Sequence, residues 1–338
     1  MQKKVLIITT GGTVVSPSGE HGAAPDAKRT DDVLSLVSDY FESNGMLSVA
    51  VRIFGDSGLD SSDIAPKDWV RIAREIDAQA GPDLAGALVV HGTDTMAYTA
   101  AWLALCFSDA EFPVVLTGSQ RTPDVIPTDG PTNLLGAASM IENAIPGVWV
   151  YFDWKIHMGG HVHKKSAAHA DAFVSVGMPS FDLMAELAKV KETPRFTCAI
   201  GKTNRKTIFA RSDEALKAAS DAVAFFFAQP GRRFVSAGQE KILILCGFGA
   251  GNIPRCLHEE IVAAYPDEKP LIIACSQAES GKKNPAAYRN VGIANLAANG
   301  FRVWSQGEYP IEFITALAHC ANFSGDTESV LSRYLERL

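Results

Sequence analysis

The sequence lacks the features that would place the chain in a membrane or on a nucleic acid. None of its apolar runs approaches the length of a membrane span, although 47% of its 338 residues are hydrophobic. It has no run of lysine and arginine that could follow a line of phosphates, and its formal net charge is -7. No charged-then-apolar leader precedes the first predicted strand, which favours a cytoplasmic location. We therefore expect a small-molecule ligand, with neither a membrane nor a nucleic acid as partner.

Paired cysteines are absent as well. The six cysteines are scattered without any C-x-x-C spacing, which disfavours both a disulfide framework and a zinc site. We expect buried, reduced thiols. These residues are Cys106, Cys198, Cys246, Cys256, Cys275 and Cys320.

Apolar, β-branched segments alternate with amphipathic segments along the first half of the chain. The predicted strands cover residues 5–9, 47–53, 87–90, 113–117 and 148–152. The predicted helices cover residues 31–43, 66–80, 94–107 and 131–143. Thr30 or Asp31 would cap the first of these helices. This alternation is typical of a parallel sheet with helices on both faces.

The second half repeats the alternation on a smaller scale. Residues 153–181 predict a short hairpin and a loop that faces the site, and we interpret residues 186–212 as a connecting segment. Predicted strands then cover residues 223–227, 242–246, 271–275 and 302–304, and predicted helices cover residues 254–264, 290–298, 311–321 and 327–336. The predicted fold class is α/β. A larger N-terminal domain (1–185) with a parallel-rich sheet covered by helices is joined to a smaller C-terminal α/β domain (213–338).

Hydroxyl and acidic side chains follow three of the predicted strands. The segments are TGGT at residues 10–13, DSSD at 60–63 and TDT at 93–95. Each segment alone is typical of a turn or a helix cap. Because the carboxyl ends of parallel strands meet in one crevice, the three together indicate a site that could attack a carbonyl and hold an amino acid.

Two of these segments carry a family resemblance. TGGT and HGTDTM at residues 91–96 resemble the two signature motifs of the bacterial-type L-asparaginase family, closest to its intracellular (type I) form. The likeness continues through residues 60–64, 116–119 and 129–134 and covers nearly the whole chain. It implies an amidohydrolase that converts L-asparagine to L-aspartate and ammonia without cofactor or metal, as a homodimer or homotetramer.

The resemblance also implies roles for single residues. Thr13 corresponds to the nucleophile that forms an acyl-enzyme, and Thr93, Asp94 and Lys164 correspond to a second catalytic group. Lys165 is a near competitor for the position of Lys164. The implied substrate-binding residues are Gly12, Ser61, Ser62, Asp94, Ser119 and Asn252.

Within this implied set, Asp94 would bind the substrate's α-ammonium and Ser61 its α-carboxylate. The backbone N–H groups of Gly12, Thr93 or both would form an oxyanion hole. Ser119 would line the side from which ammonia leaves. Asn252 lies in a glycine-rich turn implied to reach a neighbouring subunit's site, although this residue type is also typical of the turn itself.

One departure from the family concerns the loop after the nucleophile. The family usually carries a tyrosine there, hydrogen-bonded to the threonine, but its place falls on Ala23 and no tyrosine precedes Tyr40. Three explanations stay open. His21 or Glu20 supplies the base, Thr93 and Lys164 do most of the activation, or activity is low or directed at another amide. The first predicts that His21→Ala abolishes turnover and leaves aspartate binding intact.

Alternative functions remain beside the asparaginase prediction. L-glutamine or another small amide could be the substrate, or the chain could be a non-catalytic amino-acid sensor, because Ala23 replaces the tyrosine. The amidase subunit of a tRNA-dependent amidotransferase shares these motifs but resembles an asparaginase core with an added N-terminal domain, whereas this core begins at Met1. A nucleotide site is disfavoured because G-x-G-x-x-G is missing.

Four histidines between residues 156 and 170 raise the question of a metal site. Their spacing matches no recognisable ligand pattern, and we expect loop or surface histidines. They are His157, His161, His163 and His169.

Overall fold

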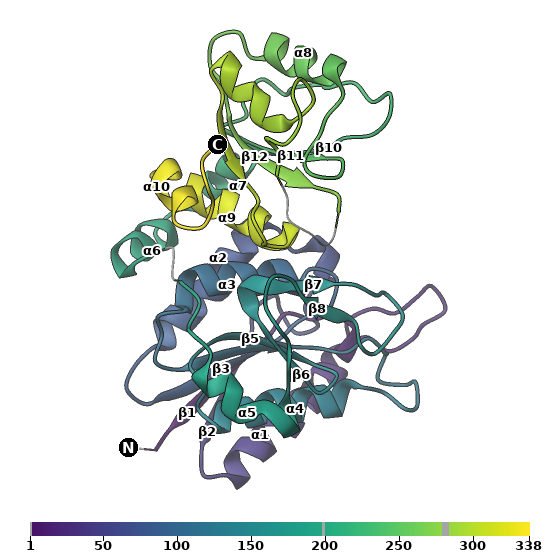
Figure 1. The fold of residues 1–338 in the computed structure, drawn as a ribbon. Coiled ribbons are helices and arrows are strands. Elements are labelled where there is room, and N and C mark those ends of the chain that lie inside the picture. The colour runs from purple at the N-terminus through teal and green to yellow at the C-terminus, as the bar shows by residue number, and fades with distance from the viewer. Residues whose placement is uncertain (1, 198–199, 279–283) are drawn as a thin grey trace. The chain divides into compact units, whose positions relative to one another are not determined.

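The computed structural model describes residues 2–197, 200–278 and 284–338, and the chain forms two compact units (Figure 1). The first unit is Met1–Cys198 and the second is Ala199–Leu338. Both are α/β, and the first holds the larger, parallel-rich sheet, so the predicted fold class is confirmed.

The first unit is built on a seven-stranded sheet in the order β2-β1-β3-β4-β5-β6-β9. The five strands from β2 to β5 in this order are parallel, while β6 pairs antiparallel with both β5 and β9. The sequence did not predict β6 and β9 as members of this sheet. The strands are β1 (Lys4–Thr9), β2 (Leu47–Arg52), β3 (Leu84–Val90), β4 (Pro113–Thr117), β5 (Gly147–Phe152), β6 (Lys155–Met158) and β9 (Phe181–Asp182).

Helices cover both faces of this sheet, as Figure 1 shows. On one face, α1 (Ala27–Ser43) packs against α4 (Gly130–Glu142), and on the other α2 (Pro66–Gln79) packs against α3 (Met96–Phe107). The strands β1, β3, β4 and β5 are almost entirely buried because helices lie on both sides of them.

Two helix starts in the first unit differ from those predicted by two residues or more. The first helix begins four residues earlier, at Ala27, since the side chain of Asp26 accepts a hydrogen bond from the backbone N–H of Arg29 and caps it. The third begins at Met96, and residues 93–95 form a turn instead. Asp94 therefore lies in that turn, ahead of the helix.

The strand order places a topological switch point between β1 and β3. The chain leaves β1 to form β2 on one side and returns to form β3 on the other side of β1. At such a point the two connections diverge and leave a crevice at the carboxyl ends of the strands. Thr13 follows β1 and Thr93 follows β3, so both lie beside this crevice.

The chain after β6 is more regular than its sequence suggests. A hairpin of β7 (Val162–Lys164) and β8 (Phe173–Ser175) carries Lys164. The predicted connection at residues 186–212 holds part of α5 (Leu183–Glu192) and all of α6 (Lys202–Phe209). Asp182 caps α5 by accepting hydrogen bonds from the backbone N–H groups of Met184 and Ala185.

The second unit has four parallel strands in the order β10-β11-β12-β13. The strands are β10 (Val223–Phe227), β11 (Ile242–Gly247), β12 (Leu271–Ser276) and β13 (Arg302–Ser305). The helices are α7 (Asp213–Ser220), α8 (Arg255–Ala264), α9 (Ile311–Ser324) and α10 (Thr327–Ser332), with the 3-10 helix η4 (Ile293–Asn299). The helix predicted over 290–298 is thus a 3-10 helix that begins later.

Two expectations about single residue types need correction. Cys256 is exposed on α8, whereas Cys106, Cys246, Cys275 and Cys320 are buried free thiols, and Cys198 lies outside the described residues. His157 is buried in β6 and is no loop or surface histidine.

The described residues contain no group of three or more histidine, cysteine or acidic side chains placed to hold a metal ion. Within the same residues, every helix is too short or too polar to span a membrane.

Buried histidines make the fold sensitive to acid. Burial lowers the pKa of His91, His157 and His319 from 6.5 to about 4, and the charge of Lys155 adds to this effect at His157. The Nδ1 of His91 lies 2.7 Å from the carbonyl oxygen of Gly92, which can only accept, so Nδ1 carries the proton. Its Nε2, 2.9 Å from the Thr99 hydroxyl, then accepts. His91 is therefore held neutral.

We predict that stability falls as pH drops from 6.5 towards 4. In this range the unfolded histidines bind protons that the folded ones do not, so the contribution is complete above pH 6.5 and is lost as pH approaches about 4. Each histidine should lower the free energy of unfolding by up to about 2 kcal/mol between pH 6.5 and 5. Urea unfolding at several pH values, with NMR titration of the ring carbons, measures this. A flat profile, or rings that titrate near pH 6.5, would contradict it.

Candidate active site

Three turns meet at the switch point because glycines let their backbones touch. Gly12 has φ 85°, and a Cβ built on it would lie 2.3 Å from the Cα of Gly92. A Cβ on Gly92 would in turn lie 2.5 Å from the Oγ of Ser61. These distances leave no room for a side chain, so glycine at both positions brings together the turns after β1, β2 and β3.

Backbone hydrogen bonds hold these turns in register. The N–H of Thr10 donates to the carbonyl of Val90 (3.0 Å), and that of Leu59 donates to the carbonyl of Thr10 (2.7 Å). The N–H of Gly12 donates to the carbonyl of Leu59 (3.1 Å), so this candidate oxyanion donor is already engaged. No acceptor for the N–H of Thr93 lies within the part of the chain that the structure describes. Thr93 is therefore the freer of the two predicted donors.

A lysine, a threonine and an aspartate form a hydrogen-bonded cluster at this point. The Nζ of Lys164 lies 2.7 Å from the Oγ1 of Thr93 and 2.5 Å from the Oδ1 of Asp94. Thr93 is buried, the Lys164 side chain is 15% exposed and the Asp94 side chain is 64% exposed. Lys165 instead pairs with Asp171, at 2.5 Å. The hairpin register thus brings Lys164, and not its neighbour, to Thr93.

Gln120 belongs to the same cluster and was missed by the sequence analysis. Its Nε2 lies 3.3 Å from the carbonyl oxygen of Ser166, which can only accept, so the amide oxygen must face the other way. That oxygen accepts a hydrogen bond from the hydroxyl of Thr93 at 3.0 Å. Its position directly after Ser119 at the end of β4 was the signal that could have identified it. Gln120 therefore orients the hydroxyl of Thr93.

Thr13 begins a short 3-10 helix, η1 (Thr13–Val15), directly above the glycine turn. Its two successors, Val14 and Val15, are buried and anchor the helix, while Thr13 itself is half-buried. The Ser16 hydroxyl donates to the carbonyl of Gly12 at 2.7 Å and closes the turn. Among the described residues, no side chain hydrogen-bonds to the hydroxyl of Thr13, so it is free to meet a ligand.

The loop that follows η1 keeps its histidine away from this arrangement. The backbones of Gly19 and Gly22 exchange two hydrogen bonds, both 3.1 Å, so Glu20 and His21 form the tip of a tight turn. Both tip side chains are exposed. Ala23 is exposed too. The structure does not bring His21 together with the cluster around Thr93.

The remaining predicted binding residues differ in how free their polar groups are. No partner for the buried Ser61 hydroxyl lies within the described ranges, whereas Ser62 donates its hydroxyl to Asp60 at 2.6 Å. Ser119 is buried and donates to the carbonyl of Arg121 at 2.7 Å. Asn252 lies in the second unit, where its Oδ1 is buried and has no hydrogen-bond partner among described residues.

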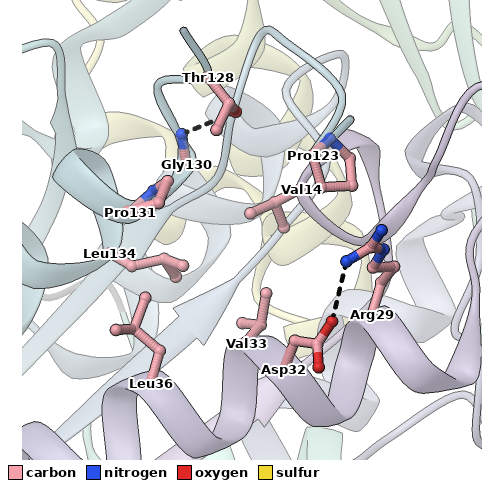
Figure 2. Close-up of a pocket in the computed structure, with 10 residues that line it drawn as sticks. All are labelled: Val14, Arg29, Asp32, Val33, Leu36, Pro123, Thr128, Gly130, Pro131 and Leu134. Carbon is pink, nitrogen blue, oxygen red and sulfur yellow. Dashed lines mark hydrogen bonds and ion pairs between the residues drawn. The ribbon is translucent and has the colours of Figure 1, made fainter. Parts of the chain in front are cut away.

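A mostly apolar cavity of about 140 Å³ lies behind η1 (Figure 2). Val14, which follows the candidate nucleophile in the chain, lines it together with Val33 of α1 and Leu134 of α4. At its rim, Arg29 pairs with Asp32 at 3.1 Å. The cavity holds none of the predicted site residues, so it is a neighbour of the site and no part of it.

Comparisons with known proteins identify the family of this chain. The family model "Asparaginase, N-terminal" matches residues 4–195. The L-asparaginase of Thermococcus kodakarensis is 32% identical over 278 residues, which are 80% of this chain and 79% of the relative. A solved structure of the thermostable L-asparaginase from that organism has a TM-score of 0.71 at 26% identity, covering 97% of this chain and 96% of the other.

Two further relatives share most of the chain. L-asparaginase 1 of Escherichia coli is 30% identical over 296 residues, covering 85% of this chain and 84% of the relative. A glutamyl-tRNA(Gln) amidotransferase protein of Methanococcus maripaludis is 28% identical over 326 residues, covering 92% of this chain and 72% of the relative. The resemblance stated from the sequence is confirmed: this chain belongs to the asparaginase family of amidohydrolases.

Proposed function

We propose that this enzyme hydrolyses the side-chain amide of L-asparagine to give L-aspartate and ammonia, with Thr13 as nucleophile. One observation carries the proposal: Thr13 follows β1, and Thr93 and Asp94 follow β3, the two strands that flank the switch point, where Lys164 of β7 contacts both Thr93 and Asp94. Relatives named L-asparaginase support the substrate class.

In the first half of the proposed reaction, the Oγ1 of Thr13 attacks the amide carbon and the carbonyl oxygen becomes an oxyanion. The unengaged N–H of Thr93 is the donor available to that oxyanion. The tetrahedral intermediate then breaks its C–N bond, the nitrogen takes up a proton and leaves as ammonia, and an ester to Thr13 remains. Water hydrolyses this ester to aspartate and restores the hydroxyl of Thr13.

The proton of Thr13 needs an acceptor, and we assign this role to the pair of Thr93 and Lys164. The ammonium of Lys164 is 2.7 Å from the Thr93 oxygen and would stabilise negative charge there. In a relay through this pair, the Thr93 oxygen takes the proton of Thr13 while the hydroxyl proton of Thr93 passes to the departing nitrogen, so Thr93 and the ammonium of Lys164 end unchanged. His21 is exposed at the tip of its turn and makes no comparable contact with Thr93 among the described residues.

Two side chains of the site can still bind the α-ammonium and the α-carboxylate of the substrate. Asp94 contacts Lys164 through Oδ1 and its side chain is 64% exposed, so it can accept the α-ammonium. The hydroxyl of Ser61, which has no partner among the described residues, can donate to the α-carboxylate. L-glutamine is the second candidate substrate, because one methylene changes binding by only about 1–3 kcal/mol.

Thr13→Ala should abolish ammonia release from L-asparagine, by at least about 1,000-fold, because the variant cannot form the ester. A panel of L-asparagine, L-glutamine and D-asparagine, with ammonia detection, identifies the substrate. Thr132→Ala, an exposed threonine of α4, is the matched control and should keep full activity. Ammonia release that persists in Thr13→Ala would contradict the nucleophile. A wild-type chain that binds aspartate but releases no ammonia would favour an amino-acid sensor.

Lys164→Met and His21→Ala separate the two sources of a base. We expect Lys164→Met to lower kcat about 100-fold or more, because it removes the charge beside Thr93, and His21→Ala to change kcat less than about threefold. Lys165→Met, which removes the neighbouring lysine that pairs with Asp171, controls for the loss of a nearby charge. Loss of turnover in His21→Ala with aspartate binding intact would place the base in the loop instead.

A further inference from the structure

We propose that Asp124 is a positioning residue that clamps the loop after Thr13, residues 16–26, against the loop after β4, residues 119–129. Its contact is to Ser18, whose backbone N–H donates to the Asp124 carboxylate at 2.9 Å. The kinetic part of this inference rests on the proposed function. The structural part, that Asp124 holds the loop, does not.

Loop 16–26 has few other attachments. At its base, the N–H of Asp26 donates to the carbonyl of Val15 at 2.9 Å, and at its tip Gly19 and Gly22 bond only to each other. Ser18 is the one residue between 17 and 25 that hydrogen-bonds outside the loop, within the chain as the structure describes it. Its hydroxyl also lies 3.2 Å from the hydroxyl of Thr122. The outer half of the loop is therefore held at one point.

The other side of the clamp is a loop with its own internal order, residues 119–129. The carboxylate of Asp129 accepts hydrogen bonds from the backbone N–H groups of Gln120 (2.9 Å) and Arg121 (3.0 Å). The Arg121 guanidinium donates to the carbonyl of Pro127 at 2.8 Å. These hydrogen bonds join the two ends of loop 119–129. Asp124 therefore lies in a loop whose conformation is held by its own contacts.

Loop 119–129 also contacts both halves of the proposed catalytic centre. Gln120 accepts from the Thr93 hydroxyl, and Asp124 holds loop 16–26, which follows the short helix of Thr13. Figure 2 shows Pro123 of this loop and Val14, the neighbour of Thr13, on the wall of the same cavity. A substitution at Asp124 should therefore alter the position of Thr13, although Asp124 touches no reacting atom.

The negative charge of Asp124 strengthens its hydrogen bond with Ser18. Hydrogen bonds from Ser18, first from its backbone N–H, lower the pKa of Asp124 to about 2. The carboxylate is thus ionised throughout the neutral range, and a hydrogen bond to an ionised acceptor is stronger than one to a neutral group.

Hydrogen–deuterium exchange of the full chain tests the clamp without reference to activity. In Asp124→Ala, exchange across residues 16–26 should rise about tenfold, while Asp124→Asn should change it less, because its amide oxygen can still accept from Ser18. Asp39→Ala, an exposed acid of α1, is the matched control and should leave exchange unchanged. Unchanged exchange in Asp124→Ala, with thermal unfolding also unchanged, would overturn the clamp.

Kinetics on the same variants test the positioning role. We expect Asp124→Ala to lower kcat about 3- to 10-fold with KM nearly constant, and Asp124→Asn to recover most of kcat. Faster exchange with unaltered kcat would overturn a role in positioning Thr13. If the wild-type chain releases no ammonia from any amide, the proposed function fails by itself, and the exchange measurement still decides whether Asp124 holds the loop.

Discussion

The contact between the backbones of Gly12 and Gly92 is the constraint on which the rest of the site depends. It lies at the switch point of the sheet, where the connections after β1 and β3 diverge. With a Cβ on either residue the two turns would have to separate, and Ser61 would move with them because it lies against Gly92. This contact keeps the turns that carry Thr13, Ser61 and Thr93 together.

Around this contact, the polar groups divide into engaged and free ones. Lys164 and Gln120 both bond to the Thr93 hydroxyl, so its orientation is set from two sides. Gly12, Ser62 and Ser119 donate to neighbouring backbone or side-chain acceptors. The groups left without partners among described residues are those that a ligand would need, such as the hydroxyl of Ser61 and the N–H of Thr93. The hydrogen bonds of these groups thus support the proposed roles separately from the family resemblance.

Much of the fold could be predicted because its signals are local. The central strands are continuous apolar runs, and helices on both faces of a parallel sheet produce that pattern directly. Errors fall at helix starts where the side chain of an aspartate caps the helix, as with Asp26 at the start of α1 and Asp182 at the start of α5. Strands β6 and β9 were missed as members of the sheet because short antiparallel additions carry little pattern of their own.

The sequence by itself determined the α/β class, the glycine turn under Thr13 and the hydroxyl and acidic residues at the strand ends, since each depends on neighbours in the chain. Only the tertiary structure decided which lysine reaches Thr93, since residues 164 and 165 adjoin at the end of β7, where side chains alternate between faces. It alone revealed the contact of Gln120 with Thr93 and that of Asp124 with Ser18. These contacts span 27 and 106 positions in the chain, and no local pattern encodes a hydrogen bond over such separations.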